Sequence, residues 1–329
     1  MSEFSQHWVN LASAKLGAEA ITCSDDFFAP MGRMLQDSAA VFIEDKYDDH
    51  GKWMDGWESR RKRGPGHDWC IIKLAKPGVI HGIEIDTTYF TGNYAPAASV
   101  EACFSDQDMP TSSQAWTSLV EQSALEGDGS HSYAVNDSSV FTHIKLHIYP
   151  DGGIARLRVY AEPKVDWDAL DPTEPVDLAA ALNGGVALAC NDQHYGDIRN
   201  LLTPGRGVNM GDGWETRRRR TPGNDWVIIA LAHPGVVKQI EVDTAHFKGN
   251  YPDRCDIRGA LLRATSLESL PQQSEHWEVL LPESKLEADQ QHYFDTDIRD
   301  IGPISHIRMN IYPDGGISRL RILSVIEKT

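Results

Sequence analysis

Hydrophobic and polar positions alternate along much of the chain in short stretches, and Gly and Pro residues separate these stretches. Ile144, Leu146 and Ile148 alternate with polar neighbours, and residues 156–159 resume the alternation after a Pro-Asp-Gly-Gly turn. A period of two residues is typical of a strand with one buried face. The pattern therefore predicts two strands joined by a tight turn at this place, and a mostly β protein overall.

Two short apolar runs, at residues 69–74 and 226–231, have the composition of fully buried strands. A Pro-Gly dipeptide follows each run, at 77–78 and at 234–235. Because Pro and Gly are strong turn formers, we expect both strands to end there in a turn.

Helical periodicity is sparse in this chain. Only two corresponding segments, 25–36 and 192–202, are predicted to form a helical turn or two, and residues 284–290 fit neither pattern clearly. Many short strands with Gly and Pro between them favour a β-sandwich of the jelly-roll kind.

The chain repeats itself at the length of a domain. DGWESRRKRGPGHDW at residues 55–69 returns as DGWETRRRRTPGNDW at residues 212–226, with 11 of 15 positions identical. Two further pairs of blocks match, 84–94 with 241–251 and 143–158 with 306–321. Folding alone rarely specifies Asp, Glu, Arg and Trp together, since a strand core requires only apolar alternation. The repeat therefore indicates a duplicated domain whose polar residues share a task.

Each copy is long enough to form a core of its own. We predict an all-β chain of two tandem, homologous jelly-roll domains, with repeat one at 1–161, a linker rich in proline and acidic residues at 162–175, and repeat two at 176–329. Repeat one also carries ten extra residues between Leu35 and Asp55.

Composition and charge narrow the range of partners. With 31 basic and 48 acidic residues the formal net charge is −17, so a nucleic acid or an anionic membrane would be repelled. The first residues lack the pattern of a signal peptide and no long apolar run occurs, which predicts a cytoplasmic protein without a membrane segment. The five cysteines form no CxxC pair, so neither a disulfide framework nor a zinc site is expected.

The two basic clusters, 60–63 and 217–220, are the first candidates for chemistry. A basic run is usually solvated charge or a localisation signal. Because this run is duplicated in an acidic chain, a role in ligand binding is an equally good interpretation. Arginine suits bidentate binding of a carboxylate. Since only alternate residues of an extended segment share a face, either Arg60 with Lys62 or Arg61 with Arg63 is the predicted pair.

Carboxylates flank both clusters. Glu58 and Asp68, with Glu215 and Asp225 in the other copy, are candidates for a general acid or base. An equally good interpretation is that they only form salt bridges with the arginines.

Further polar and aromatic residues have a default structural role beside a functional one. The two Asp-Gly-Gly segments have the composition of tight turns. Arg156 and Arg319 follow these turns and could reach either a ligand or the turn carbonyls. Tryptophans such as Trp69 are more often core anchors than stacking platforms. Asn93 and Asn250 are turn formers that can also offer a donor and an acceptor to an amide-like ligand.

Familiar catalytic motifs are missing from the sequence. It contains no HExxH, no tight cluster of His and Asp, no G-x-S-x-G, no P-loop and no G-x-G-x-x-G. We therefore expect neither a metal nor another cofactor. Most histidines of one copy are replaced in the other. The position of His67 in repeat one is held by Asn224 in repeat two, and asparagine does not titrate.

Several of these motifs together resemble those of the allantoicase (allantoate amidinohydrolase) family. They are residues 51–61, 67–69, 84–87 and 92–93 and both Pro-Asp-Gly-Gly-Ile-x-Arg-Leu-Arg loops, and the likeness covers essentially the whole chain. The resemblance implies two jelly-roll, galactose-binding-like domains per subunit and assembly into homo-oligomers, with a hexamer as one candidate. It also implies hydrolysis of allantoate to ureidoglycolate and urea in purine (allantoin) degradation.

The chemistry of allantoate guides the assignment of roles. Its tetrahedral carbon carries one carboxylate and two ureido groups, and the bond that breaks is an aminal C–N bond, so a general acid and a base are enough. We expect Glu58 or Asp68 to transfer protons with His67 in reserve, Arg60 or Arg61 to bind the carboxylate, and Asn93 to bind a ureido group. Trp69 and Arg156 complete the predicted substrate contacts. The corresponding second-copy residues are Glu215, Arg217, Arg218, Asp225, Asn250 and Arg319.

Two other functional classes remain open at this point. Tandem β-sandwich domains also bind glycans or peptides without catalysis, and the charged residues could serve only subunit contacts. Within the enzyme hypothesis, we expect one site with repeat one dominant, because only repeat one has the ten-residue extension and His67.

Overall fold

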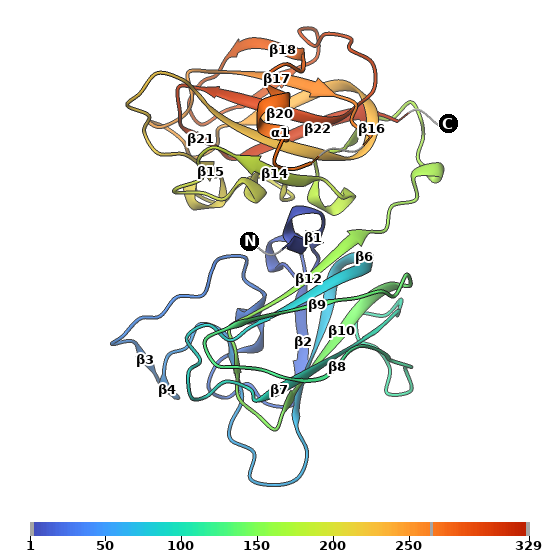
Figure 1. Ribbon diagram of the computed structural model, residues 1–329, viewed down its shortest axis with the longest axis vertical. Helices are drawn as coiled ribbons and strands as arrows, with labels where there is room; N and C mark the ends of the chain where they lie inside the picture. Colours follow the sequence, from blue (N-terminus) through green and yellow to red (C-terminus); the bar gives the residue numbers. More distant parts are fainter. Residues whose placement is uncertain (1–2, 264–265, 327–329) are drawn as a thin grey trace. The chain divides into compact units, whose positions relative to one another are not determined.

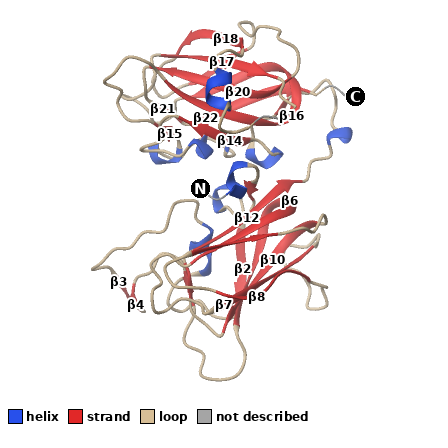
Figure 2. Cartoon of the chain, in the orientation of Figure 1, coloured by secondary structure: helices blue, strands red, loops and turns tan. Residues whose placement is uncertain are grey.

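Strands make up nearly all of the regular structure, as the alternating pattern predicts. The computed structural model describes residues 3–263 and 266–326, and the chain divides into two units, Met1–Lys164 and Val165–Thr329 (Figure 1). Figure 2 shows that both units consist of strands and loops with a few short helical turns. The prediction of an all-β chain is confirmed. In the described part of the chain no helix is long and apolar enough to cross a membrane.

Repeat one contains one eight-stranded sheet and two small hairpin-like pairs. The order in the large sheet is β1-β12-β6-β10-β7-β8, and β2 and β9 also pair with β6. The strands are β1 (Val9–Asn10), β2 (Glu19–Cys23), β3 (Tyr47–Asp48), β4 (Gly51–Lys52), β5 (Trp57–Glu58), β6 (Asp68–Asp86), β7 (Ala97–Cys103), β8 (Thr117–Ala124), β9 (Ser130–Ala134), β10 (Val140–Tyr149), β11 (Gly153–Ile154) and β12 (Arg156–Pro163).

Repeat two has the same topology, in the order β13-β22-β16-β20-β17-β18, with β14 and β19 on β16. Its elements are β13 (Val176–Asp177), β14 (Val186–Cys190), β15 (Trp214–Glu215), β16 (Asp225–Asp243), β17 (Arg254–Ala260), α1 (Leu270–Ser274), β18 (Glu278–Lys285), β19 (Gln291–Phe294), β20 (Ile304–Tyr312), β21 (Gly316–Ile317) and β22 (Arg319–Val325). Short 3-10 turns complete both repeats, at Glu3–Gln6, Ala14–Leu16, Met31–Leu35, Trp167–Ala169, Ala181–Asn183, Ile198–Leu202 and Met210–Asp212.

The long strand β6 joins the two groups of strands in repeat one. Its first part, up to Lys73, pairs with β2 and β10, whereas its last part pairs with β12 from Gly78 and with β9 from Gly82. The same strand therefore changes partners along its length, which is how one sheet forms both layers of a sandwich. Fully buried isoleucines of β6, among them Ile72, Ile83 and Ile85, supply the core.

The predicted turns after the apolar runs are wrong. β6 and β16 continue through Pro77-Gly78 and Pro234-Gly235 as single strands of 19 residues. Proline has no N–H to donate to the ladder and is tolerated where strand pairing is interrupted. That is the case here, because the register between β10 and β6 shifts between Phe141 and His143, opposite this point.

The two predicted helical segments form only 3-10 turns, at Met31–Leu35 and Ile198–Leu202. The undecided segment 284–290 begins inside β18 and continues as a loop. All five cysteines are free thiols.

The Pro-Asp-Gly-Gly loop is a turn for identifiable reasons. Gly152 has φ of 135°, a left-handed value that favours glycine. A Cβ at Gly153 would lie 2.0 Å from the ring of Phe90, so only glycine fits there. Asp151 accepts a hydrogen bond from the backbone N–H of Lys62 at 2.7 Å. The loop therefore holds the basic segment against the sandwich.

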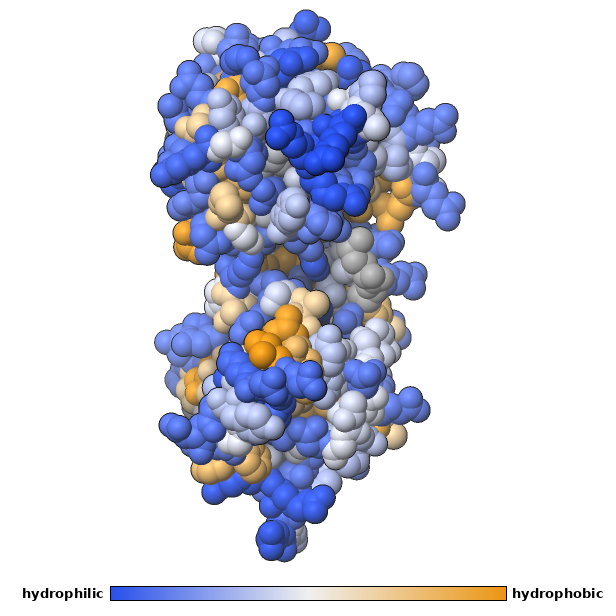
Figure 3. All heavy atoms as spheres, turned by 90° about the vertical axis from the view of Figure 1, so that its left-hand side faces the viewer, coloured by the Kyte–Doolittle hydropathy of each residue, from blue (hydrophilic) through white to orange (hydrophobic). Residues whose placement is uncertain are grey.

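Most of the visible surface is hydrophilic, with small apolar patches on each unit (Figure 3). In repeat one, exposed apolar residues concentrate in the ten-residue extension, where Val41, Phe42, Ile43 and Tyr47 are between 44% and 68% exposed. The extension therefore lies on the outside of the sandwich and is available to form one wall of a site.

Candidate active site

A cavity of about 340 Å³ lies in repeat one. Its walls come from four segments that are distant in the sequence: the loop that follows β2, the β5 strand, the loop that follows β6, and the extension specific to repeat one. The lining residues are Phe28, Phe42, His50, Gly51, Lys52, Met54, Glu58, Tyr89, Thr91 and Asn93.

Glu58 is the acidic residue of this cavity. In the two-residue strand β5, which pairs with β11, the neighbours Trp57 and Ser59 are buried, so the Glu58 side chain lies on the opposite face. Trp57 anchors the strand because its indole N–H donates to the carbonyl of Asp25 at 2.9 Å. Short as it is, β5 thus holds its carboxylate in a defined place.

Burial raises the pKa of the Glu58 carboxyl above its ordinary value. Asn93 donates from Nδ2 to Oε1 of Glu58 at 2.8 Å, and this hydrogen bond lowers the pKa and partly offsets the burial. A carboxyl whose pKa is raised toward the working pH is suited to give and take a proton. The predicted residues Glu58 and Asn93 are therefore brought together in one cavity.

The extension supplies five of the lining residues, Phe42, His50, Gly51, Lys52 and Met54. β3 and β4 form a small hairpin in which Tyr47 pairs with Lys52. The Lys52 ammonium donates to the carbonyl of Ile43 at 2.9 Å and to the carbonyl of Glu44. It also lies 4.7 Å from the ring of Phe42. These contacts hold a positive charge at the cavity.

Arg156 holds the extension in place from inside the protein. Its side chain is fully buried and forms an ion pair with Asp55 at 2.7 Å. It also donates to the carbonyls of Ser38 at 2.8 Å and of Ala39 at 3.3 Å. The sequence-based prediction that Arg156 contacts substrate is not supported by this placement, since no part of its side chain is exposed. The other predicted use, contact with the carbonyls of the turn, is not observed either, because the carbonyls that Arg156 reaches belong to Ser38, Ala39, Asp55 and Ala155.

The basic cluster is largely occupied by acidic partners. Arg60 donates from Nε to Asp25 at 2.7 Å, and Lys62 lies 2.8 Å from Asp68. The side chains of Arg61 and Arg63 are exposed. The predicted alternatives thus divide into an ion-paired set, Arg60 with Lys62, and an exposed set, Arg61 with Arg63.

Arg60 lies close to the cavity although it does not line it. Its guanidinium is 5.0 Å from the ring of Phe27, and that ring stacks at 4.3 Å on His50, which does line the cavity. Arg60 is 62% exposed, and its charge is neutralised by the ion pair with Asp25.

Asp68 and Trp69 lie in the sandwich and do not line the cavity. Asp68 is 1% exposed and accepts a hydrogen bond from Ser24 Oγ at 2.8 Å, in addition to its ion pair with Lys62. Trp69 is half-buried, with the ammonium of Lys145 at 5.0 Å from its ring. The salt-bridge alternative for Asp68 therefore describes its contacts well.

His67 belongs to a separate chain of hydrogen-bonded groups. Its Nε2 is 2.9 Å from Nδ1 of His147, whose Nε2 is 2.9 Å from Oε2 of Glu101. In repeat two the same positions hold a neutral pair, in which Asn224 donates to Asn310 at 3.2 Å. Only repeat one can therefore titrate here.

Buried histidines predict a loss of stability in acid. Burial lowers the pKa values of His143 and His147 below 6.5, although their acidic contacts oppose the shift. The unfolded chain then binds more protons than the folded chain, so stability is lost as pH falls through 6.5 toward the lowered values. We expect the free energy of unfolding to fall from pH 7.5 to pH 5.5, by up to about 1.4 kcal/mol per pH unit for each histidine, and the melting temperature to fall with it. Thermal unfolding measured across this range tests this, and His147→Asn, which copies Asn310, should flatten the slope. An unchanged slope in that variant would remove His147 from the explanation.

Repeat two keeps the carboxylate and the amide of the cavity. Asn250 donates to Oε1 of Glu215, as Asn93 does to Glu58. Arg217 pairs with Asp192 at 2.8 Å, the counterpart of the Arg60 contact. Arg218 is exposed, as Arg61 is.

The remaining second-copy candidates are buried in ion pairs. Arg219 pairs with Asp225, which is 2% exposed, and Arg319 pairs with Asp212 at 2.8 Å. Arg319 is 3% exposed, so it resembles Arg156 in serving the fold.

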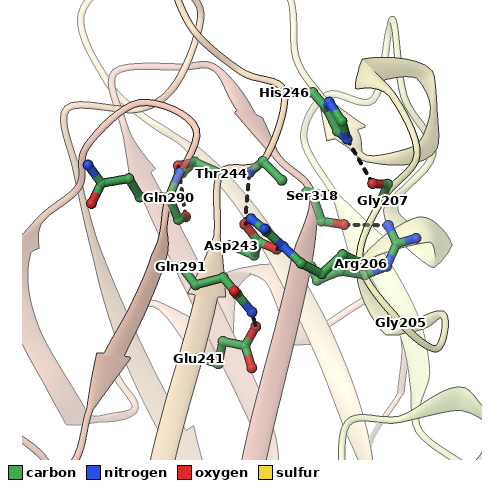
Figure 4. A network of polar contacts seen from close by, with 12 residues as sticks. Gly205, Arg206, Gly207, Glu241, Asp243, Thr244, His246, Gln290, Gln291 and Ser318 are labelled. Atoms are coloured by element: carbon green, nitrogen blue, oxygen red, sulfur yellow. Dashed lines mark hydrogen bonds and ion pairs between the residues drawn. The ribbon is translucent and has the colours of Figure 1, made fainter.

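The short loop of repeat two lies where repeat one has its extension. Figure 4 shows Arg206 on Asp243, with Nε to Oδ2 at 2.8 Å and the terminal nitrogen to Oδ1 at 3.0 Å. His246, which corresponds to Tyr89 of the cavity, has Nε2 2.7 Å from the carbonyl of Gly207. The loop is therefore tied down by its own ion pair and by a histidine contact.

Sequence reasoning missed Lys52, His50 and Phe42 as lining residues. The available signal was the extension itself, which occurs in one copy and ends in Gly51-Lys52-Trp53-Met54. Over residues 3–263 and 266–326, no three His, Cys, Asp or Glu side chains converge as metal ligands would.

Fold and cavity together define a tandem β-sandwich protein with a small polar site that contains a partly buried carboxyl group. Comparison with known proteins identifies the family: the allantoicase repeat matches residues 9–164 and 176–327. The chain belongs to the allantoicase family, and it is a hydrolase that acts on C–N bonds of linear amidines.

The relatives are similar over their full length. A probable allantoicase of Burkholderia mallei is 55% identical over 326 residues, which are 99% of this chain and 97% of that protein. A probable allantoicase of Pseudomonas fluorescens is 53% identical, with 98% of each chain covered. The crystal structure of allantoicase from Saccharomyces cerevisiae is 36% identical with a TM-score of 0.82, covering 98% of this chain and 96% of that one.

Proposed function

We propose that this chain hydrolyses allantoate to ureidoglycolate and urea in the cavity of repeat one. The observation that carries this proposal is the half-buried Glu58 carboxyl in a cavity of about 340 Å³. Its Oε1 accepts a hydrogen bond from Nδ2 of Asn93 at 2.8 Å. That volume is near the lower end for small-molecule sites, which suits a substrate of allantoate's size. The family supports the same reaction.

Glu58 can serve as acid and then as base. In the first step its carboxyl gives a proton to the nitrogen of the departing ureido group, while the lone pair of the other ureido nitrogen forms a C=N bond. Urea leaves. In the second step the Glu58 carboxylate takes a proton from water, and the hydroxyl adds to the carbon to give ureidoglycolate. The carboxyl is thereby restored and the protons balance.

Asn93 has two tasks in this proposal. Its Nδ2 holds Glu58 in position, and its Oδ1 accepts a hydrogen bond from a ureido N–H. We assign proton transfer to Glu58 rather than Asp68, because Asp68 is already paired with Lys62 away from the lining residues. His67 stays in reserve. Arg60 and Arg61 are proposed to act at the rim, where they attract an anionic substrate.

The raised pKa of Glu58 predicts a particular pH profile. If the protonated carboxyl starts the reaction, kcat falls as pH rises through that raised pKa, by about tenfold per pH unit well above it. Asn93→Ala removes the bond that lowers the pKa, so the falling limb should move to higher pH. Measuring kcat at saturating allantoate for both proteins tests this. A kcat that rises with pH over the same range would contradict the acid role.

The direct test of the reaction is to incubate purified protein with allantoate and quantify urea and ureidoglycolate. A glycan-binding screen is the counter-test, since a non-catalytic tandem β-sandwich would bind a glycan and release no urea. Assembly into a homo-oligomer and residence in the cytoplasm remain predictions. Light scattering after size-exclusion chromatography tests the first.

A further inference from the structure

We propose that Lys52 binds the substrate carboxylate and makes the cavity selective for an anionic ureide. This inference rests on the proposed function and names the residue that determines specificity at the same site. Among the residues that line the cavity, Lys52 is the one lysine or arginine. It replaces Arg60 and Arg61 as the principal anchor.

The charge of Lys52 is held in place but not neutralised. Two of its three N–H donors point to the carbonyls of Ile43 and Glu44, which leaves one donor for a ligand. The rings of Phe42 and Tyr47, at 4.7 and 5.0 Å, stabilise the ammonium without adding a negative charge. In the part of the chain that the structure describes, Lys52 forms no salt bridge.

Three nearby cations differ from Lys52 in this respect. Arg60 has Asp25, Lys62 has Asp68, and Arg156 has Asp55 as a carboxylate partner. A cation that already has a carboxylate partner gains less from a second one. Lys52 therefore offers an unneutralised positive charge to an anion in the cavity, within a chain whose net charge of −17 repels anions in general.

The composition of the cavity also limits which anion fits. Glu58, which becomes a carboxylate once it has given up its proton, lies in the same cavity as Lys52, so a ligand with several negative charges would then be repelled while meeting one ammonium. A small molecule with one carboxylate at one end and neutral amide groups at the other places each group opposite a complementary partner. The neutral groups then reach Glu58 and Asn93.

Repeat two lacks this anchor. The cation of its short loop, Arg206, makes a bidentate ion pair with Asp243, which is fully buried (Figure 4). Its charge is therefore neutralised by the protein itself. Selective binding of an anionic ureide is then confined to repeat one, although Glu215 and Asn250 repeat the chemistry of Glu58 and Asn93.

The test compares Lys52→Met and Lys52→Arg with wild-type protein on allantoate and on its uncharged carboxamide. We expect Lys52→Met to raise KM for allantoate by about 10- to 100-fold, the range for a hydrogen bond to a charged group, with kcat changed less than threefold. Lys52→Arg should recover part of the loss. On the carboxamide, wild type and Lys52→Met should have equal kcat/KM, because no charge is left to recognise.

Lys46→Met is the matched control. Lys46 lies in the same extension, with its ammonium 3.7 Å from the ring of Trp53, and it does not line the cavity. This variant should keep KM within about twofold, within the ordinary range of surface substitutions. If Lys52→Met folds poorly by circular dichroism, Lys52→Gln provides the neutral variant.

The outcomes separate the two proposals. Wild-type protein that releases no urea from allantoate contradicts the proposed function. Wild-type activity with unchanged KM in the neutral Lys52 variants overturns the assignment of Lys52 alone. An equal loss on allantoate and on the carboxamide also overturns it, since that would show a structural role for the extension.

Discussion

Glu58→Gln is expected to reduce the turnover of allantoate by about a hundredfold to ten-thousandfold, the contribution of a positioned acid or base. The amide keeps the size of the side chain and loses the proton transfer. Glu215→Gln is the matched control, because Glu215 has the same amide partner, Asn250, in a repeat whose loop carries a neutralised cation. It should keep most of the wild-type turnover.

Turnover and melting temperature of the two single variants and the double variant decide the number of sites. One site in repeat one predicts that Glu58→Gln and the double variant behave alike. Two complete sites predict a loss of about half in each single variant and of all activity in the double variant. Equal partial losses would therefore refute the single-site proposal.

Arg156→Met is expected to destabilise repeat one by about 3–5 kcal/mol, because it leaves Asp55 as an unpaired, nearly buried charge. Each kcal/mol lowers the melting temperature of a domain of this size by roughly 2–4 °C. The variant should also lose affinity for allantoate at low temperature, where it is still folded. The reason is that Arg156 donates to the carbonyls of Ser38 and Ala39, in the extension that positions Lys52.

Arg319→Met separates the two effects. Arg319 is as buried as Arg156 and has an equivalent partner in Asp212. We expect a comparable loss of stability but an unchanged KM, because repeat two contributes no residue to the cavity. A similar rise of KM in both variants would mean that the loss at Arg156 reflects general destabilisation.

The fold class and the tandem organisation could be predicted from sequence because they depend on short-range periodicity and on repetition. The alternation at Ile144, Leu146 and Ile148 lies within β10, and the repeated blocks correspond to equivalent strands of two similar units. The turn predicted at Pro77 failed because a dipeptide preference is local. Whether a strand ends there depends on pairing with β10, which lies about 60 residues further along the chain.

Glu58 and Asn93, which the structure places in one cavity, were candidates from sequence as members of repeated polar motifs that core packing does not require. The sequence alone determined which residue types were available for chemistry and that repeat one carries an extension. The sequence did not determine which basic side chains lack a carboxylate partner. Arg60 is neutralised by Asp25 and Arg156 by Asp55, partners 35 and 101 residues away. Only the tertiary structure decides such pairs, because ion pairing depends on distance in space. It leaves the charge of Lys52 without a carboxylate partner in the described chain, in the cavity that Glu58 also lines.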